Sequence, residues 1–420
     1  MSHAVPTISG PLDADVRLPG SKSLTIRALF TAALARGESR VMEPLDSEDT
    51  QAARRCLRGL GVEIAESKTD WLVHGHGGEF LPPSDALDAG ESGLTARSLL
   101  AVTSLIDGRS LVTGRGRLPD RPMRGLADVM IALGARVELT GSGLPAIVNG
   151  SGSIPGGAVV VDASRTTQFA TAVLLAAPLA ESALTVVLDG LQGSAGYLDL
   201  TVDVMRTFGA NVERSGDAFR IAPTGYRATR YSVEPDASSA VYPMVAAAIV
   251  GGRVTVESLG SDSAQPDYRV AGVLAEMGCR VSATASTTTV ESDGSLGPID
   301  VDFSGAPDGA LAVAVACLFA DQGSRIRGLG SLRHKESDRL KALVEQIENV
   351  GARARIDGDD LHITPGMLRP ATIRTYADHR IAMSFALIGL ARPGIEIDDP
   401  AVVDKTWPGY WDFIDSLAST

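Results

Sequence analysis

The chain has 420 residues, 44% of them hydrophobic, and a formal net charge of −13 at neutral pH. This length allows two or three domains with sizeable cores, and the acidic balance argues against nucleic acid or an acidic membrane as the main partner. The N-terminus has no apolar signal core, and apolar runs such as that from Ala310 are too short to cross a bilayer. We therefore expect a cytoplasmic protein that binds neither membrane nor nucleic acid.

The first predicted helix follows the stretch LPGSKSLTIRALF, residues 18–30. A nucleotide P-loop needs Gly, four residues and then Gly-Lys-Ser/Thr, but Ser21 separates Gly20 from Lys22 and no glycine stands at the required upstream position. The helix should begin near Ser23, with free backbone N–H groups and Lys22 at its start and Arg27 one turn later on the same face. This arrangement predicts an anion site. A capped helix with a solvated lysine is the structural alternative.

Six copies of one pattern follow along the chain. Each is an Ala- and Leu-rich helix, a glycine and a β-rich segment, and the glycines recur at intervals of about 71 residues or twice that. One of the six copies, near residue 180, has Glu181 and Ser182 instead of the glycine. The marker glycines are Gly37, Gly108, Gly251, Gly323 and Gly394.

A second helix, which should be amphipathic, ends at another glycine between these copies. A glycine just after a helix, followed by β-branched residues, is typical of a helix end and a strand start. These glycines are Gly61, Gly134, Gly209, Gly278 and Gly351. The first helix of each copy is apolar nearly all round and should be buried. We predict small α/β units, three in a domain of residues 19–234 and three in a domain of residues 1–18 plus 235–420, with a cleft between the domains.

Basic side chains gather in loops beside the expected helix starts of this acidic chain. They are Lys22, Arg27, Arg97, Arg121, Arg339, Arg380 and Lys405. So many cations indicate a basic cleft that binds a small molecule with several negative charges, such as two phosphates or carboxylates.

Single residues also have structural explanations. Helix N-caps would account for Asp236, Asp308, Asp378 and Ser337. Lys335 and Arg339 could form a solvated pair on one helix face, and Thr166 and Thr167 could simply start a helix. We interpret His379 as an orienting group rather than a base.

Metal sites and disulfides are not expected. The cysteines Cys56, Cys279 and Cys317 lie in apolar segments and form no CxxC motif, so we predict buried, reduced thiols. His74 and His76 have a metal-like spacing, but no cysteine or further histidine lies nearby.

The loop motifs resemble those of the 5-enolpyruvylshikimate-3-phosphate synthase family. In order they are LPGSKSLTIRAL, DRPM, TTQF, HKESDRL, YADHRIAM and DKTWPGY, and the resemblance runs from about residue 17 to 413. It implies a two-domain inside-out α/β barrel of six βαβαββ-type units, three per domain. It also implies a transferase that moves the enolpyruvyl group of phosphoenolpyruvate to the 5-hydroxyl of shikimate 3-phosphate, in aromatic amino-acid biosynthesis. The reaction needs no cofactor, and we expect a monomer.

The resemblance also implies roles for individual residues. Phosphoenolpyruvate would be held by Lys22, Gly93, Arg121, Gln168, Arg339, Arg380 and Lys405. Shikimate 3-phosphate would lie on Lys22, Ser23, Arg27, Thr166, Thr167, Gln168, Ser194, Asp308 and Lys335. We expect Asp308 as the base for the 5-hydroxyl and Glu336 as the proton donor to the methylene carbon, with Lys22 assisting the departing phosphate.

The chain departs from the family pattern at a few positions. The usual Asn-Ala-Gly-Thr stretch reads Glu91-Ser92-Gly93-Leu94. Ile26 stands where Asn is common, and Ser331 stands where many members have an Asn that contacts the substrate. These changes leave open a relative in specialised metabolism that acts on another cyclic hydroxy acid.

Two further alternatives are disfavoured by single residues. The sister enzyme for UDP-N-acetylglucosamine has Lys-Asn near its start and usually a reactive cysteine before the Arg-Pro step, whereas here Ser23 follows Lys22 and that loop has no cysteine. A silent binding protein on the same scaffold would be expected to have lost Lys22, Glu336 or Arg380, and all three are present.

Overall fold

The structure is a computed structural model that describes residues 2–190 and 195–418. The chain divides into two compact units: unit 1 is Met1–Pro19 with Pro235–Thr420, and unit 2 is Gly20–Glu234. Each has its own hydrophobic core. The described helices are all too short or too polar to cross a membrane.

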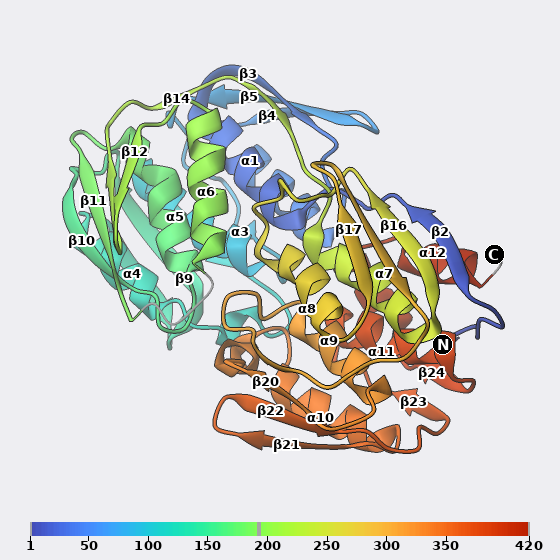
Figure 1. The fold of residues 1–420 in the computed structure, drawn as a ribbon. Helices are drawn as coiled ribbons and strands as arrows, with labels where there is room; N and C mark the ends of the chain where they lie inside the picture. Colours follow the sequence, from blue (N-terminus) through green and yellow to red (C-terminus); the bar gives the residue numbers. More distant parts are fainter. Residues whose placement is uncertain (1, 191–194, 419–420) are drawn as a thin grey trace. The chain divides into compact units, whose positions relative to one another are not determined.

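Unit 2 contains three repeats of strands and helices (Figure 1). The first comprises α1 (Lys22–Leu34), β3 (Ala35–Met42), α2 (Glu48–Gly59), β4 (Glu63–Glu66) and β5 (Asp70–His76). The second comprises β6 (Leu87–Asp88), α3 (Gly93–Val102), β7 (Asp107–Thr113), α4 (Arg124–Ala132), β8 (Arg136–Thr140) and β9 (Gly143–Ser151). The third comprises β10 (Gly157–Asp162), α5 (Gln168–Ala176), β11 (Leu184–Asp189), α6 (Gly196–Thr207), β12 (Val212–Ser215) and β13 (Ala218–Ile221), and β14 (Tyr226–Arg227) and β15 (Arg230–Ser232) follow.

Unit 1 repeats the same plan. Its first repeat comprises β2 (Leu12–Val16), α7 (Ala237–Val250), β16 (Gly252–Glu257), α8 (Val270–Glu276), β17 (Arg280–Ala283) and β18 (Thr287–Ser292). The second comprises β19 (Asp300–Asp302), α9 (Ala310–Ala316), β20 (Ser324–Arg327), α10 (Arg339–Asn349), β21 (Arg353–Asp357) and β22 (Asp360–Thr364). The last comprises β23 (Ala371–Ile373), α11 (His379–Ala391), β24 (Ile395–Ile397) and α12 (Tyr410–Leu417), to which β1 (His3–Ala4) adds a strand.

The described strands form six sheets, three in each unit, so the predicted α/β repeats are confirmed. In a complete repeat the first two strands are parallel and the last two join antiparallel, as in the order β6-β7-β9-β8. In the first repeat of each unit, a chain segment distant in sequence completes the sheet: β2 pairs with β16, and β14 and β15 pair with β3. In each complete repeat a helix must connect the two parallel strands, and this is the buried helix.

The two helix types also follow the prediction. In unit 2, α1, α3 and α5 contact one another inside the sheets, as α7, α9 and α11 do in unit 1 (Figure 1). The residues of these helices are almost entirely buried, whereas α2, α4, α6 and α10 each bury one face. A buried polar side chain at the start of an inner helix is therefore an exception that needs a partner.

Each outer helix that the sequence marked with a glycine ends at that glycine. The five residues lie two positions after the last helical residue and have φ between 87° and 106°. Only glycine adopts this left-handed backbone without strain, so it stops the helix and turns the chain into the next strand.

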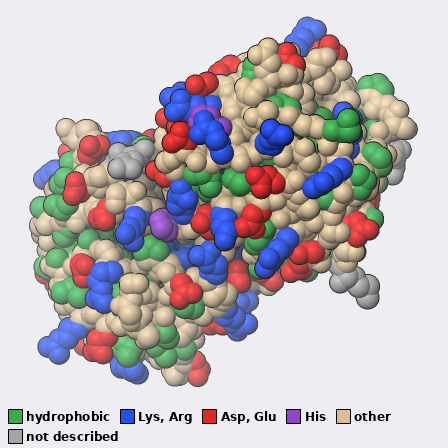
Figure 2. Space-filling model, turned by 90° about the horizontal axis from the view of Figure 1, so that it is seen from below, with side chains coloured by type: hydrophobic (Ala, Val, Ile, Leu, Met, Phe, Trp, Pro, Cys, Tyr) green, Lys and Arg blue, Asp and Glu red, His purple; other side chains and the backbone are tan. Residues whose placement is uncertain are grey.

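The predicted thiols are confirmed as buried and unpaired. Burial raises the pKa of both Cys56 and Cys317 to about 12, so neither is a nucleophile near neutral pH. Among the residues that the structure describes, no group of three or more His, Cys, Asp or Glu side chains could hold a metal ion. On the surface, acidic and basic side chains are interspersed over the face drawn in Figure 2.

Candidate active site

In unit 2, the first helix start holds the predicted lysine. Helix α1 begins at Lys22, one residue before the expected start, and the hydroxyl of Ser21 accepts a hydrogen bond from the Leu24 N–H at 3.5 Å. Lys22 Nζ lies 3.2 Å from the Asp49 carboxylate in the first turn of α2, and its side chain is 18% exposed. The solvated-lysine alternative is therefore wrong, because the ammonium group is largely buried beside a carboxylate.

Arg27 is buried one turn into the same helix. Its guanidinium donates to the Thr201 hydroxyl at 2.8 Å and to the carbonyl oxygens of Ser23 at 3.0 Å and Tyr197 at 3.1 Å. Burial lowers the pKa of Arg27 to about 10, which still leaves it a cation at neutral pH. A buried cation among uncharged oxygens favours an anionic ligand.

A second cluster lies at the starts of α3 and α5. The Arg97 guanidinium donates to the side-chain oxygen of Gln168 and, at 3.1 Å, to the carbonyl of Pro122, the residue after Arg121. A Cβ atom on Gly93 would come within 2.7 Å of the Arg97 guanidinium and 3.0 Å of that of Arg121. The structure thus brings Gly93, Arg121 and Gln168 together, and glycine is the residue that lets both arginines approach α3.

The remaining predicted residues of unit 2 lie near α5. Thr167 occupies the N-cap position of that helix, and the Thr166 hydroxyl accepts from the Gln168 N–H at 3.2 Å, as the helix-start alternative predicts. Ser23 is partly exposed in the first turn of α1. Ser194 lies outside the described residues.

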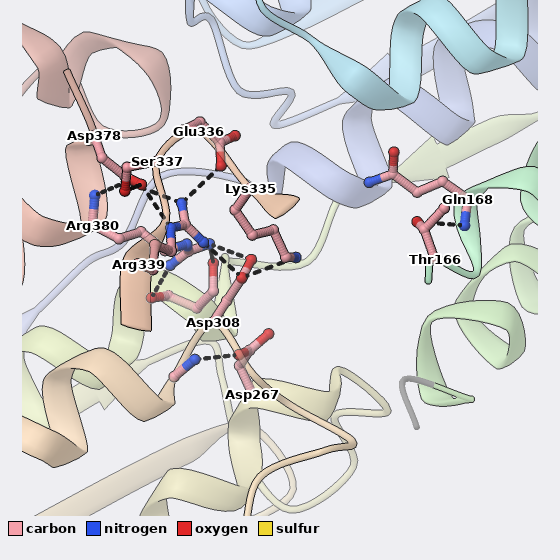
Figure 3. Close-up of polar contacts among 12 residues, drawn as sticks. Thr166, Gln168, Asp267, Asp308, Lys335, Glu336, Ser337, Arg339, Asp378 and Arg380 are labelled. Carbon is pink, nitrogen blue, oxygen red and sulfur yellow. Dashed lines mark hydrogen bonds and ion pairs between the residues drawn. The ribbon is translucent and has the colours of Figure 1, made fainter. Parts of the chain in front are cut away.

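In unit 1, the predicted residues form one network of ion pairs, and Figure 3 labels all of its members except Lys405. We call it the unit 1 cluster, and it consists of Asp308, Lys335, Glu336, Arg339, Asp378, Arg380 and Lys405. Four cations thus face three carboxylates.

Arg339 is the centre of the unit 1 cluster. Its guanidinium binds both oxygens of Asp378, at 2.7 and 3.0 Å, and donates to Asp308 and Glu336 at 2.9 Å each. These carboxylates raise the pKa of Arg339 although burial alone would lower it. Its side chain is 1% exposed, so a ligand reaches it only if one of its carboxylate partners moves.

Asp308 bridges three cations. Its carboxylate lies 3.2 Å from Lys335, 2.9 Å from Arg339 and 3.3 Å from Arg380. Burial alone would raise the pKa of Asp308, but these three charges outweigh it and hold the pKa well below the usual range. Its side chain is 19% exposed, so this carboxylate is partly accessible.

Arg380 links the unit 1 cluster to α7. Its guanidinium donates to the Ser238 hydroxyl at 2.9 Å and lies 3.4 Å from the Tyr242 hydroxyl. Nearby carboxylates, Asp308 first among them, raise the pKa of Arg380 against the effect of burial. No local feature of the sequence predicts the Tyr242 contact, because this tyrosine lies within an apolar helix.

The structural alternatives are settled residue by residue. Asp236 and Asp378 do cap α7 and α11, as predicted. The cap explanation is wrong for Asp308, since Gly309 occupies that position of α9 and the carboxylate turns to the cations. It is also wrong for Ser337: Asp338 caps α10, and Ser337 donates to Asp378 at 2.9 Å.

The solvated-pair alternative for Lys335 and Arg339 is wrong as well, because both bind Asp308. Lys405 is buried with its Nζ 3.9 Å from Glu336. His379 is 1% exposed at the start of α11, with Nδ1 3.8 Å from Asp378. Its orienting role stays a prediction.

Several residues of the site were not selected from the sequence. Asp49 contacts the predicted binding residue Lys22, and Asp378 was expected only as a cap. Arg97 was predicted as a cation of the basic cleft, but its contact with Gln168 was not. The YADHR motif did contain a signal for Asp378, since an arginine follows the acid.

The departures from the family pattern are distributed over both units. Ile26 and Leu94 are buried apolar residues of α1 and α3. Ser331 lies in the short 3₁₀ helix at Gly330–His334, and its buried hydroxyl has no hydrogen-bond partner among the described residues.

Comparison with known proteins finds relatives of one family over nearly the whole chain. A family model described as EPSP synthase (3-phosphoshikimate 1-carboxyvinyltransferase) matches residues 6–414. The chain is 40% identical over 408 residues to a 3-phosphoshikimate 1-carboxyvinyltransferase of Methanoculleus marisnigri, covering 96% of each chain, and 39% identical over 417 residues to one of Aliivibrio salmonicida, covering 97% of each. A solved EPSP synthase structure from Acinetobacter baumannii superposes with a TM-score of 0.83 at 25% identity, over 99% of this chain and 98% of that one.

Proposed function

The chain belongs to the EPSP synthase family, and we propose that it catalyses that family's transfer of the enolpyruvyl group from phosphoenolpyruvate to the 5-hydroxyl of shikimate 3-phosphate, with release of phosphate. This is a step of the shikimate pathway to aromatic amino acids. The observation that carries the proposal is the partly accessible Asp308 carboxylate held between three cations. Such a site supplies a base beside groups that bind the charges of the substrates.

Each unit supplies candidate residues for phosphoenolpyruvate. In unit 2 these are Lys22, the backbone of Gly93, Arg121 and Gln168. Arg97 supports them, because its guanidinium holds the Gln168 amide and lies against Gly93. In unit 1 they are Arg339, Arg380 and Lys405. Arginine and lysine at helix starts are suited to the carboxylate and phosphate of this substrate.

Shikimate 3-phosphate would be bound through its phosphate and its ring hydroxyls. Arg27 is the strongest candidate for the phosphate, because its present hydrogen bonds go to uncharged oxygens. The hydroxyls of Ser23, Thr166 and Thr167 and the amide of Gln168 would complete this side, with Lys22 between the two substrates and Ser194 outside the described residues. Asp308 and Lys335 would contact the ring hydroxyls from unit 1.

The low pKa of Asp308 has a mechanistic consequence. A carboxylate stabilised by three cations is a weak base. When the anionic groups of phosphoenolpyruvate bind Arg339 and Arg380, they would replace Asp308 as the counterion. The pKa of Asp308 would then rise toward its ordinary value, and it would accept the proton of the 5-hydroxyl as that oxygen attacks the enol carbon.

Glu336 would supply the proton for the methylene carbon. Its carboxylate lies 2.9 Å from Arg339 and 3.9 Å from Lys405, so the same substrate charges would favour its protonated form. After addition, Glu336 would take a proton back from the new methyl group as the C–O bond to phosphate breaks. Lys22 would stabilise the departing phosphate, which leaves with the proton first taken from the 5-hydroxyl.

Phosphate release from phosphoenolpyruvate tests the proposal when three acceptors are compared: shikimate 3-phosphate, unphosphorylated shikimate and UDP-N-acetylglucosamine. We expect strong turnover only when shikimate 3-phosphate is the acceptor. No turnover with it, in a folded protein, would contradict the proposal. The alternative of another cyclic hydroxy acid would then gain support, since Ser331 has a buried hydroxyl with no partner in the described part of the chain.

A further inference from the structure

The position of Asp308 is set by the backbone beside it. Its side chain is turned to the cations and does not cap the helix that follows. Helix α9 starts at Ala310 without a side-chain cap. Instead, the N–H of Gly309, the residue directly after Asp308, donates to the carboxylate of Asp267 at 2.9 Å (Figure 3) and, over a longer 3.2 Å, to the Ala306 carbonyl. Asp267 belongs to a different segment, the 3₁₀ helix at Pro266–Arg269, and is 3% exposed.

The segment that carries Asp267 is fixed at its other end. Gln265 donates from its amide nitrogen to the Pro235 carbonyl at 2.7 Å and accepts from the Ala237 N–H at 3.2 Å. Pro235 is the first residue of unit 1 after the chain returns from unit 2. Residues 265–267 thus join the returning chain to the loop of Asp308.

Space around Gly309 is limited on the same side. A Cβ atom there would lie 2.9 Å from the Val270 side chain and 3.3 Å from the Asp267 carboxylate. The Asp308 loop is therefore packed directly on the Asp267 segment. A change at Asp267 should shift Gly309 and, with it, the neighbouring Asp308.

We propose that Asp267 is a positioning residue that holds the Asp308 carboxylate in reach of Lys335, Arg339 and Arg380, and that Gln265 anchors it. This inference rests on the proposed function, in which Asp308 is the base. It differs from a charge effect of Asp267 on Arg380, because it requires only an oxygen that accepts the Gly309 N–H. The two explanations predict different results for an asparagine at this position.

The test compares Asp267→Ala, Asp267→Asn and a control, Asp262→Ala, which removes an exposed carboxylate from the same loop. We expect Asp267→Ala to lower kcat about 10- to 100-fold, the range for a misplaced reacting group, with KM for phosphoenolpyruvate changed less than about threefold. Asp267→Asn keeps an accepting oxygen and should stay within about threefold of the wild type, as should the control.

Hydrogen exchange at the Gly309 amide provides a readout that does not depend on activity. Exchange should accelerate in Asp267→Ala and stay slow in Asp267→Asn. Unchanged kcat in Asp267→Ala, or equal losses of kcat in both variants, would overturn the proposal. If the wild type releases no phosphate with shikimate 3-phosphate, the proposed function fails, and the exchange data alone decide whether Asp267 holds this loop. Equal exchange in all variants would overturn the inference at any activity.

Discussion

The buried arginines Arg27 in unit 2 and Arg339 in unit 1 have different kinds of partner. Around Arg27 in unit 2, the hydrogen bonds go to a hydroxyl and two carbonyl oxygens, and burial lowers the pKa. Arg339 in unit 1 is surrounded by three carboxylates that raise its pKa. An anion at Arg27 supplies a missing charge, whereas an anion at Arg339 must replace a carboxylate that is already there. In the proposed mechanism, unit 1 therefore converts substrate binding into a change in the pKa of Asp308, whereas the Arg27 site only binds.

The largest effect on turnover should follow from removing the Asp308 carboxylate, which we propose that the substrate replaces as the counterion of the cations. Asp308→Asn should lower kcat by about 10²–10⁴, the range for loss of a general base, and should leave KM for phosphoenolpyruvate unchanged or lower, because the cations lose a competitor. Steady-state kinetics with both substrates measures this. Full turnover in the folded variant would remove Asp308 from the mechanism.

Replacing the central cation should mainly affect stability. Arg339→Met leaves Asp378, Asp308 and Glu336 without their shared partner and should reduce the free energy of unfolding by about 3–5 kcal/mol. The matched control is Arg355→Met, which removes an exposed pair with Asp357 and should cost less than about 1 kcal/mol. Denaturant unfolding of both variants measures these losses. Equal losses in the free energy of unfolding would mean that Arg339 is not the centre of a buried network.

Replacing Arg27 should weaken the binding of shikimate 3-phosphate and leave the rate of the chemical step nearly unchanged. Arg27→Ala removes charge-assisted hydrogen bonds worth about 1.5–3 kcal/mol, so KM for shikimate 3-phosphate should rise roughly 10- to 100-fold while kcat changes little. Arg220→Ala, at a position with an exposed side chain, serves as the control. A loss confined to kcat would show that unit 2 also acts on the chemical step.

The smallest effect concerns pH. The pKa of Asp308 is lower in the folded protein than in the unfolded chain, so its ionised form stabilises the fold above the unfolded pKa of about 4, and this stabilisation is lost as pH falls further. The difference in unfolding free energy between wild type and Asp308→Asn should therefore stay constant from neutral pH to about pH 5 and change only in more acidic solution. A change between pH 7 and 5 would show that the three cations do not hold the carboxylate ionised.

Much of the fold could be predicted because its signals are local. A left-handed glycine after each outer helix and an apolar inner helix recur with one period, and both report on backbone geometry that a few residues determine. The start of α1 was placed within one residue for the same reason.

Side-chain partners were harder to predict. Ser337 and Asp338 are adjacent and both suit a helix cap, and only the position of Asp378 decides that Asp338 caps while Ser337 turns to Asp378. The contact of Asp267 with Gly309 joins separate segments and has no periodic signature. Charge types were thus readable from the sequence, but the choice among competing partners depends on the tertiary structure.

The most direct test of the central claim is to identify the product formed from phosphoenolpyruvate and shikimate 3-phosphate by proton and phosphorus NMR. We expect vinyl protons of an enolpyruvyl ether at the 5-oxygen and one equivalent of inorganic phosphate. Phosphate accompanied by free pyruvate, or no reaction in the folded protein, would contradict the assignment of this site to enolpyruvyl transfer.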